Sequence, residues 1–177
     1  MIINPSKYAL NGWIKAHEAC PSLNLKEQVQ QAGFDLRVNI IYDIVGTGSL
    51  LANNKKKLPN YGQRPFSLYE SYQDCWFLEK GVYSVDCMED VALPIGKEAK
   101  VIHRSTLNRS GLLFTGSVYD PGFEGLIGGT LYVSNSFWLQ RGSRIGQIQI
   151  QDCEEGELYN GDYQKTFSHV TAKEALK

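Results

Sequence analysis

The sequence predicts an all-β fold of the sandwich, jelly-roll or barrel kind, preceded by a short N-terminal helix. From Phe34 onward, runs of roughly five to eight residues are rich in β-branched and aromatic side chains, which favour strands. Gly, Pro, Asn or Asp bounds each run, as expected for turns between short strands. No long helical pattern alternates with these runs, which argues against an α/β nucleotide-binding fold.

The first 31 residues differ from the rest. Ser6 can cap a helix over Lys7–Ala19, weakened by Gly12 and ended by Pro21. One face of that helix carries five apolar side chains: Tyr8, Ala9, Trp13, Ile14 and Ala16. We therefore expect residues 1–31 to form a helical N-terminal segment of a single domain that spans residues 1–177.

The expected strands follow one another with turn residues between them. They lie within residues 34–46, 74–94 (two strands around Lys80 and Gly81), 111–120, 125–135, 137–142 and 144–152. Between two of these runs, Pro121 and Gly122 mark a tight turn, because proline presets φ at the first central position and glycine supplies a positive φ at the second. This turn either leaves Asp120 in solvent or directs Asp120 and Phe123 into a site.

Two other short segments have simple structural interpretations. Residues 46–49, with the sequence GTGS, lack the lysine and the following helix of a phosphate-binding loop, so a turn at a strand end is expected. The basic run Lys55–Lys57 lies among Asn, Pro and Gly and is expected to be a solvated loop.

Composition narrows the class of protein. The net charge of −1 argues against a nucleic-acid binder, and no apolar run approaches the ~20 residues of a membrane helix. The N-terminus lacks the features of a signal peptide, so a cytoplasmic location is expected. The cysteines (Cys20, Cys75, Cys87, Cys153) are far apart and are expected to be buried thiols, and the histidines (His17, His103, His169) are too scattered for a metal cluster.

Four segments, in order, resemble the superfamily that contains trimeric dUTPases and dCTP deaminases. They are AGFDLRV (Ala32–Val38), HRSTLNRSGL (His103–Leu112), YDPGFEG (Tyr119–Gly125) and RGSRIGQIQI (Arg141–Ile150). Two linking stretches agree, EKGVYSVDCMEDVALP (Glu79–Pro94) and ELYNGDYQ (Glu157–Gln164). The resemblance covers about residues 32–164. It implies a distorted jelly-roll barrel, a homotrimer with sites at the subunit interfaces, and a deoxynucleoside triphosphate ligand bound with Mg²⁺.

The resemblance also implies roles for individual residues. Asp120 would orient the attacking water and contact the sugar 3′-hydroxyl, and Phe123 would pack on the deoxyribose. Phosphate oxygens would be held by four residues: Arg104, Ser105, Arg109 and Gln147. Thr130 and Tyr159 would pack near the sugar or base, residues 154–177 would form a C-terminal tail or lid, and Mg²⁺ would be held mainly through the phosphates. Asp35 and Arg144 are expected to form an internal polar pair rather than to bind ligand.

Some positions depart from the patterns of these enzymes. Deaminases in this superfamily use a glutamate ten residues after the turn aspartate, where this chain has Thr130, and a threonine hydroxyl does not shuttle protons near neutral pH. The acidic residue nearest in the sequence to Thr130, Glu124, is expected to be solvated. Asp162 stands where deaminases usually carry a phosphate-binding lysine. The segment from Arg104 to Asp120 is shorter than in either enzyme group, and it includes the hairpin whose backbone reads the base, so the identity of the base stays open. The pair Gly128-Gly129 is expected to loosen the strand that lines the site.

Three hypotheses remain from the sequence. The first is a dUTPase-like pyrophosphohydrolase, which would release pyrophosphate in the presence of Mg²⁺. The second is a dCTP deaminase, which would release ammonia from dCTP. The third is a non-catalytic nucleotide sensor or protein-binding trimer, which would bind deoxynucleoside triphosphates without turnover.

Overall fold

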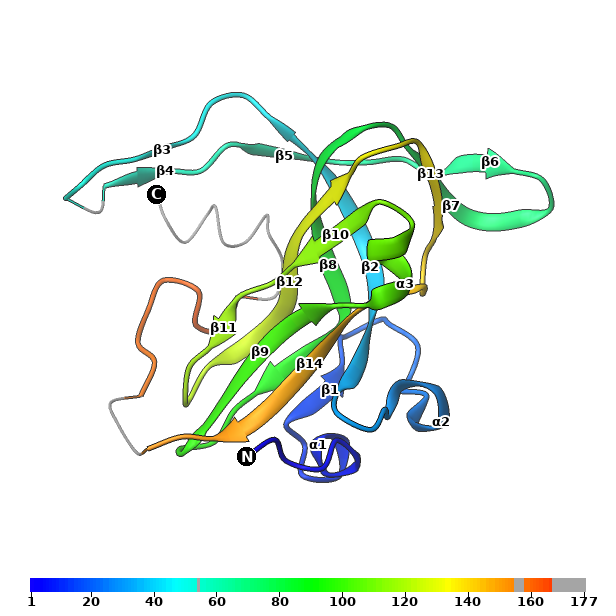
Figure 1. Cartoon of the computed structure of the whole chain (residues 1–177). Coiled ribbons are helices and arrows are strands. Elements are labelled where there is room, and N and C mark those ends of the chain that lie inside the picture. Colours follow the sequence, from blue (N-terminus) through cyan, green and yellow to red (C-terminus); the bar gives the residue numbers. More distant parts are fainter. Residues whose placement is uncertain (54, 155–157, 167–177) are drawn as a thin grey trace.

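The computed structural model describes residues 1–53, 55–154 and 158–166, and they form a mostly antiparallel β structure (Figure 1). In chain order, the elements are α1 (Ser6–Leu10), β1 (Ile14–Ala16), α2 (Leu25–Gln28), β2 (Phe34–Val45), β3 (Ser49–Leu50), β4 (Lys56–Lys57), β5 (Asn60–Gln63), β6 (Ser67–Tyr69), β7 (Tyr72–Leu78), β8 (Gly81–Ala92), β9 (Lys97–His103), α3 (Ser105–Arg109), β10 (Leu112–Thr115), β11 (Val118–Tyr119), β12 (Glu124–Val133), β13 (Phe137–Gln140) and β14 (Arg144–Asp152). The predicted all-β class is confirmed.

The main sheet has nine strands and curls into a half-barrel. Its order is β10-β12-β8-β2-β14-β9-β11, with β1 also paired to β8 and β5 to β2. The first and last strands of this order, β10 and β11, are consecutive in the chain and are joined by Gly116 and Ser117 alone. Because two residues span only about 7–10 Å, the two edges of the sheet must approach each other. A Cβ at Gly116 would lie 2.5 Å from the Val101 Cβ, so the closure requires glycine.

Irregular pairing helps the sheet to curl. The register shifts between β2 and β8, between β12 and β8, and between β14 and β2. Such bulges bend a strand and increase its twist. The concave side holds the core, which includes the fully buried side chains of Phe34, Leu36, Ile41, Leu131 and Ile148.

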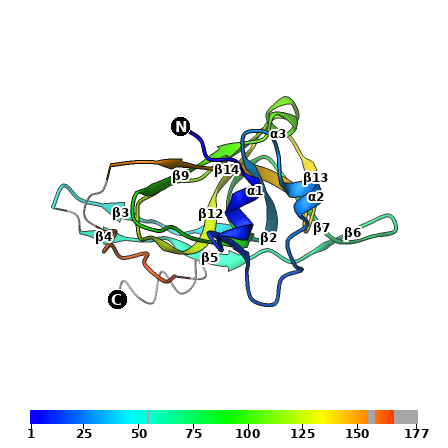
Figure 2. The same ribbon diagram turned by 90° about the horizontal axis from the view of Figure 1, so that it is seen from below.

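Two smaller β structures extend from opposite ends of the molecule (Figures 1 and 2). One is the β3–β4 ribbon, and the other is the three-stranded sheet β13-β7-β6. In the second, the Tyr69 and Trp138 rings stack with centroids 4.4 Å apart. Lys55–Lys57 are exposed, as predicted, but Lys56 and Lys57 pair with β3 as strand β4 rather than forming a loop. The predicted turn at residues 46–49 does follow β2, with Gly46 at a φ of 83°.

The predicted helix over residues 7–19 is too long. Helix α1 ends at Leu10, Gly12 takes a φ of 70°, and Ile14–Ala16 form a strand paired with β8. Ser6 is the first helical residue rather than the cap, and its side chain hydrogen-bonds Asn4. The apolar stripe had suggested one helix, but its members enter the core from two elements. The backbone N–H and C=O groups of Ile14–Ala16 pair with β8 instead of forming helical hydrogen bonds. Gly12 ends the helix at little steric cost, because glycine adopts a positive φ readily.

A buried ion pair ties the segment before β2 to the sheet. Arg37 Nε donates to Glu89 Oε1 at 2.7 Å, and the backbone N–H of Arg37 donates to Oε2 at 2.8 Å. Gln28 Nε2 also donates to Oε1, and the Arg37 guanidinium reaches the carbonyls of Pro21 and Ser22. The Glu89 side chain is fully buried. Burial raises the pKa of Glu89, while the hydrogen bonds from Arg37 oppose this shift.

The cysteines are free thiols that differ in burial. Cys75 and Cys87 are buried thiols, as predicted, whereas Cys20 and Cys153 are only partly buried. In the part of the chain that the structure describes, none of the helices has the length and apolar character to cross a bilayer.

Gly129 tests why two glycines occur together in β12. A Cβ at Gly129 would lie 2.2 Å from the carbonyl oxygen of Thr115, so the glycine allows β10 to approach β12 closely. We expect Gly129→Ala to lower the free energy of unfolding by about 2 kcal/mol or more, because backbone must move to admit the methyl group. Gly62→Ala is the matched control, since no described atom lies within 4 Å of the position that its methyl group would take in β5. Urea unfolding of both variants measures the difference, and equal midpoints would contradict this explanation.

Candidate functional site

The turn from Asp120 to Gly122 adopts the conformation that its residues predict. It joins β11 to β12, Gly122 has a φ of 81°, and the Phe123 N–H donates to the Asp120 carbonyl at 3.1 Å. Leu93, just after β8, holds the turn from the other side: it accepts from the Gly122 N–H at 3.1 Å and donates to the Phe123 carbonyl at 2.9 Å. The turn is therefore fixed to the sheet.

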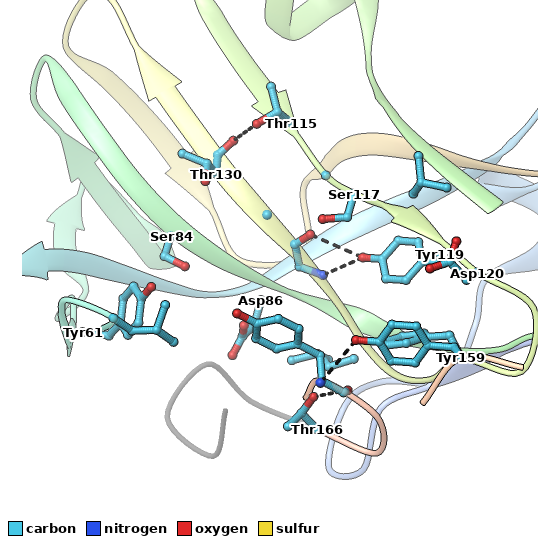
Figure 3. Close-up of a pocket in the computed structure, with 18 of the residues that line it drawn as sticks. Tyr61, Ser84, Asp86, Thr115, Ser117, Tyr119, Asp120, Thr130, Tyr159 and Thr166 are labelled. Carbon is cyan, nitrogen blue, oxygen red and sulfur yellow. Dashed lines mark hydrogen bonds between the residues drawn. The ribbon is translucent and has the colours of Figure 1, made fainter. Parts of the chain in front are cut away.

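The turn opens onto a cavity of about 550 Å³ (Figure 3). Its walls come from the turn, from β8, β10, β11 and β12, from the β4–β5 region and from the tail. It brings together four of the predicted site residues: Asp120, Phe123, Thr130 and Tyr159. Among the described residues that line it, none is lysine or arginine.

Aromatic rings line the end of the cavity that contains Asp120. The Phe123 ring centroid lies 5.0 Å from that of Tyr119 and 5.4 Å from that of Tyr159. Phe123 and Tyr119 are buried, whereas Asp120 is exposed. The Tyr119 hydroxyl lies 3.4 Å from the backbone N of Gly128, from which it accepts a hydrogen bond. Burial raises the pKa of Tyr119, so its phenol is neutral at physiological pH.

The cavity also has a polar floor, formed by Ser84 and Asp86 from β8, Thr115 from β10 and Thr130 from β12 (Figure 3). Ser84 and Asp86 share a face because alternate residues of a strand point the same way. Thr130 pairs with Ser84 on one side and with Thr115 on the other, and Gly128 pairs with Asp86.

Asp86 is the site residue that the sequence analysis missed. It is 1% exposed, and the Tyr42 hydroxyl donates to its Oδ2 at 2.9 Å. Burial, followed by the charge of Asp86 and this hydrogen bond, raises the pKa of Tyr42, which therefore remains a donor. An acidic residue within a central, mostly apolar strand was the available signal, because such a residue is rarely buried without a polar role.

The tail closes one side of the cavity. The Tyr159 N–H donates to the Pro121 carbonyl at 2.8 Å, and Gln164 Nε2 donates to the Gly122 carbonyl at 2.7 Å. Further along, the Lys165 N–H donates to the Glu124 carbonyl at 2.7 Å. Residues 158–166 thus lie against the turn and the start of β12. Glu124 is exposed, as predicted, and the rest of the predicted tail, residues 155–157 and 167–177, lies outside the described residues.

Asp162 forms an ion pair instead of facing the cavity. Its Oδ2 contacts the Lys56 Nζ, and the same ammonium lies 5.0 Å from the centre of the Tyr163 ring. The negative charge that the sequence placed near a triphosphate is therefore matched by the basic strand β4. This chain has an aspartate where deaminases usually carry a lysine, and Lys56 offsets the charge of that aspartate.

A second cluster surrounds the buried carboxylate of Asp35. Gln147 Nε2 donates to its Oδ1 at 2.8 Å, and Arg144 Nη1 donates to its Oδ2 at 3.2 Å. Arg104 Nε lies 3.4 Å from the same oxygen. The predicted pair of Asp35 and Arg144 is confirmed, and Arg104 and Gln147 join it.

The predicted phosphate-binding residues do not line the cavity. Arg104 follows the end of β9, whereas β11 pairs with Ala99 and Lys100 near the start of β9. At about 3.3 Å per residue, the five residues from Ala99, the partner of Tyr119, to Arg104 span roughly 16 Å along the strand. Ser105 and Arg109 are exposed on α3. Within one chain, the residues predicted to contact the sugar and those predicted to hold the phosphates form two separate groups.

Comparisons with known proteins agree with this fold. Residues 10–153 match a family model described as dCTP deaminase-like. The deoxyuridine 5′-triphosphate nucleotidohydrolase of Methanocaldococcus jannaschii is 35% identical over 141 residues, which cover 78% of this chain and 88% of that protein. The probable deoxyuridine 5′-triphosphate nucleotidohydrolase of Aeropyrum pernix is 32% identical over 168 residues, covering 93% and 98%.

A solved structure shows the same fold. The 2′-deoxycytidine 5′-triphosphate deaminase from Agrobacterium tumefaciens superposes with a TM-score of 0.62 at 21% identity. The match covers 86% of this chain and 48% of that chain, so this chain spans about half the length of that protein.

Proposed function

Because this chain belongs to the dCTP deaminase-like family, we propose that it is a dUTP diphosphatase-like hydrolase. It would cleave the α–β phosphoanhydride of a deoxynucleoside triphosphate to give a monophosphate and pyrophosphate. One observation carries the proposal: an exposed carboxylate, Asp120, stands beside buried aromatic rings at one end of a cavity large enough for a nucleoside. The names of the archaeal relatives make dUTP the first substrate to test.

Asp120 would act on water. A carboxylate that accepts a proton from a bound water makes that water a better nucleophile toward the α-phosphorus. Phe123 and Tyr159 would pack against the deoxyribose, and a ring packed there leaves no room for a 2′-hydroxyl. The hydrogen bonds from Leu93 and the tail hold the turn in place, so the carboxylate would need little reorganisation.

Hydrolysis is better supported than deamination. The position that carries glutamate in deaminases is Thr130, which pairs with Ser84 and Thr115 on the polar floor. A hydroxyl group can hydrogen-bond a nucleobase but does not exchange protons with it near neutral pH. For hydrolysis, Asp120 supplies the general base that accepts a proton from water.

The triphosphate would be held by a second copy of the chain. No cationic side chain lies among the described residues of the cavity, whereas Arg104 and Gln147 gather around Asp35 at the other end of β9. A homotrimer would bring the Asp120 cavity of one subunit against Arg104, Ser105, Arg109 and Gln147 of another. Arginine suits this role because its planar donors match phosphate oxygens.

Mg²⁺ fits the donors at this site. The lining includes the carboxylates of Asp86 and Asp120 and several hydroxyl groups, and oxygen atoms are the ligands that Mg²⁺ prefers. The ion would be held mainly through the triphosphate. When bound, Mg²⁺ would neutralise charge on the phosphates during transfer.

The buried thiols of Cys75 and Cys87 suit a reducing compartment, which supports a cytoplasmic location.

A product assay tests the reaction. The purified protein is incubated with each deoxynucleoside triphosphate and Mg²⁺, and pyrophosphate, ammonia and nucleotide products are measured separately. We expect pyrophosphate and a monophosphate from at least one substrate. Ammonia without pyrophosphate would establish deamination instead, and binding without any product would favour a non-catalytic nucleotide-binding role.

Mixing two inactive variants tests the shared site. Asp120→Asn and Arg104→Ala are each expected to be inactive as homotrimers. After joint unfolding and reassembly, about a quarter of the sites would combine an intact Asp120 from one subunit with an intact Arg104 from another, and activity would return. If each site lies within one chain, the mixture stays inactive.

A further inference from the structure

We propose that Asp86 sets the base preference of this site by accepting a hydrogen bond from the exocyclic amine of a cytosine base. The inference rests on the proposed function, which places a deoxynucleotide in the cavity. It differs from that function in naming a base other than the uracil in the names of the archaeal relatives.

The position of the sugar indicates where the base lies. If the deoxyribose packs on Phe123 beside Asp120, the rest of the cavity must hold either the base or the phosphates. The described lining contains no lysine or arginine, and its floor holds the carboxylate of Asp86. A triphosphate is usually held by arginine or lysine side chains, so these walls do not suit it. A neutral base, which presents donors and acceptors along its edge, fits the polar floor instead.

The strands hold Asp86 in a defined place on that floor. It lies on the central strand β8, opposite Gly128 of β12, and Gly128 adds no side chain beside it. Thr130 is its diagonal neighbour, within the usual reach of cross-strand contacts. The Tyr42 hydroxyl donates to Oδ2 and so orients the carboxyl plane. The carboxylate oxygens of Asp86 accept hydrogen bonds, so the group on the base that it recognises would be a donor.

Cytosine satisfies this requirement better than uracil does. Cytosine carries an N4 amine, and a carboxylate accepting from that amine is a known mode of base recognition. Uracil has a carbonyl at the same position, and its N3–H is flanked by two carbonyl oxygens. A carboxylate facing that edge would repel at least one of them. The hydroxyls of Ser84 and Thr130 donate or accept as required, so they do not reverse the preference.

Binding of non-hydrolysable analogues tests the inference without relying on turnover. Calorimetry would measure the α,β-imido analogues of dCTP and dUTP against the full-length protein with Mg²⁺. We expect the dCTP analogue to bind about tenfold more tightly or better. In Asp86→Asn, the side-chain amide keeps its size and gains a donor for uracil O4, so the preference should fall by about tenfold. Asp43→Asn, which alters a partly exposed aspartate on β2 paired with Arg64, should leave the ratio unchanged.

The possible results separate this inference from the proposed function. A wild-type preference for the dUTP analogue, or an unchanged ratio in Asp86→Asn, would overturn the role of Asp86 even if pyrophosphate is released. The wild-type ratio needs no variant, so it decides the question even if Asp86→Asn fails to fold. A preference for the dCTP analogue without pyrophosphate release would support Asp86 and overturn the hydrolase. If neither analogue binds, both are wrong.

Discussion

Replacing Asp120 by asparagine is expected to lower kcat for pyrophosphate release by about a hundredfold or more, the usual contribution of a positioned general base. Asparagine has nearly the same shape, so the turn and its hydrogen bonds through the Asp120 carbonyl should persist. The amide cannot take a proton from water, so the loss should appear in kcat rather than in substrate affinity. Steady-state kinetics and binding of an imido analogue measure the two effects separately.

Glu124→Gln is the matched control for this substitution. Glu124 is an exposed carboxylate only four residues away, and its contacts with the tail run through its backbone N–H and carbonyl groups. We expect wild-type kcat in this variant. Wild-type kcat in Asp120→Asn would mean that Asp120 is not the base. An equal loss in both variants would mean that general charge near the turn matters instead.

Replacing Arg37 by alanine is expected to lower the free energy of unfolding by about 3 kcal/mol or more at neutral pH. The change leaves the Glu89 carboxylate fully buried without its cationic partner. It also removes the guanidinium bonds to the Pro21 and Ser22 carbonyls, which hold the segment before α2. Urea unfolding measures the loss. Lys100→Met, which breaks an exposed contact with Glu98, should change the free energy of unfolding very little.

The stability loss in Arg37→Ala should depend on pH. Burial raises the pKa of Glu89 in the folded protein, so this group weakens folding as the pH rises from the usual glutamate range through the raised pKa, and its effect is constant above that. Removing Arg37 takes away groups that lower the pKa and so raises it further. The difference between wild type and variant should therefore be larger at about pH 7.5 than at about pH 5, where more of the carboxyl is protonated. A difference that grows on acidification would contradict this account.

Much of the strand pattern could be read locally. Strands β2, β7, β8, β12, β13 and β14 lie largely within the predicted runs, because their β-branched and aromatic residues and their bounding turn residues act over a few positions. The run over residues 111–120 is different. It contains two strands that pair at opposite edges of the sheet, and only the closure of the sheet at Gly116 separates them.

The N-terminal prediction failed for a related reason. Apolar residues at Tyr8, Trp13 and Ile14 satisfy a helical spacing, but they equally satisfy a short helix followed by a strand once Gly12 turns the chain. Whether Ile14 continues a helix or pairs with Val91 depends on the end of β8 that β2 does not cover. That pairing position exists only in the folded sheet.

In the candidate site, too, some features follow from local sequence and others follow only from the tertiary structure. The sequence alone determined the turn at Pro121 and Gly122, the presence of a carboxylate and an aromatic residue beside that turn, and the absence of a glutamate at position 130, because each depends on residue chemistry within one short segment. The tertiary structure alone decided that Asp86 lies on the floor of the same cavity, that Asp162 pairs with Lys56, and that Arg104 and Gln147 gather around Asp35 away from Asp120. These relations join residues far apart in the chain, and only strand order and register bring such residues together.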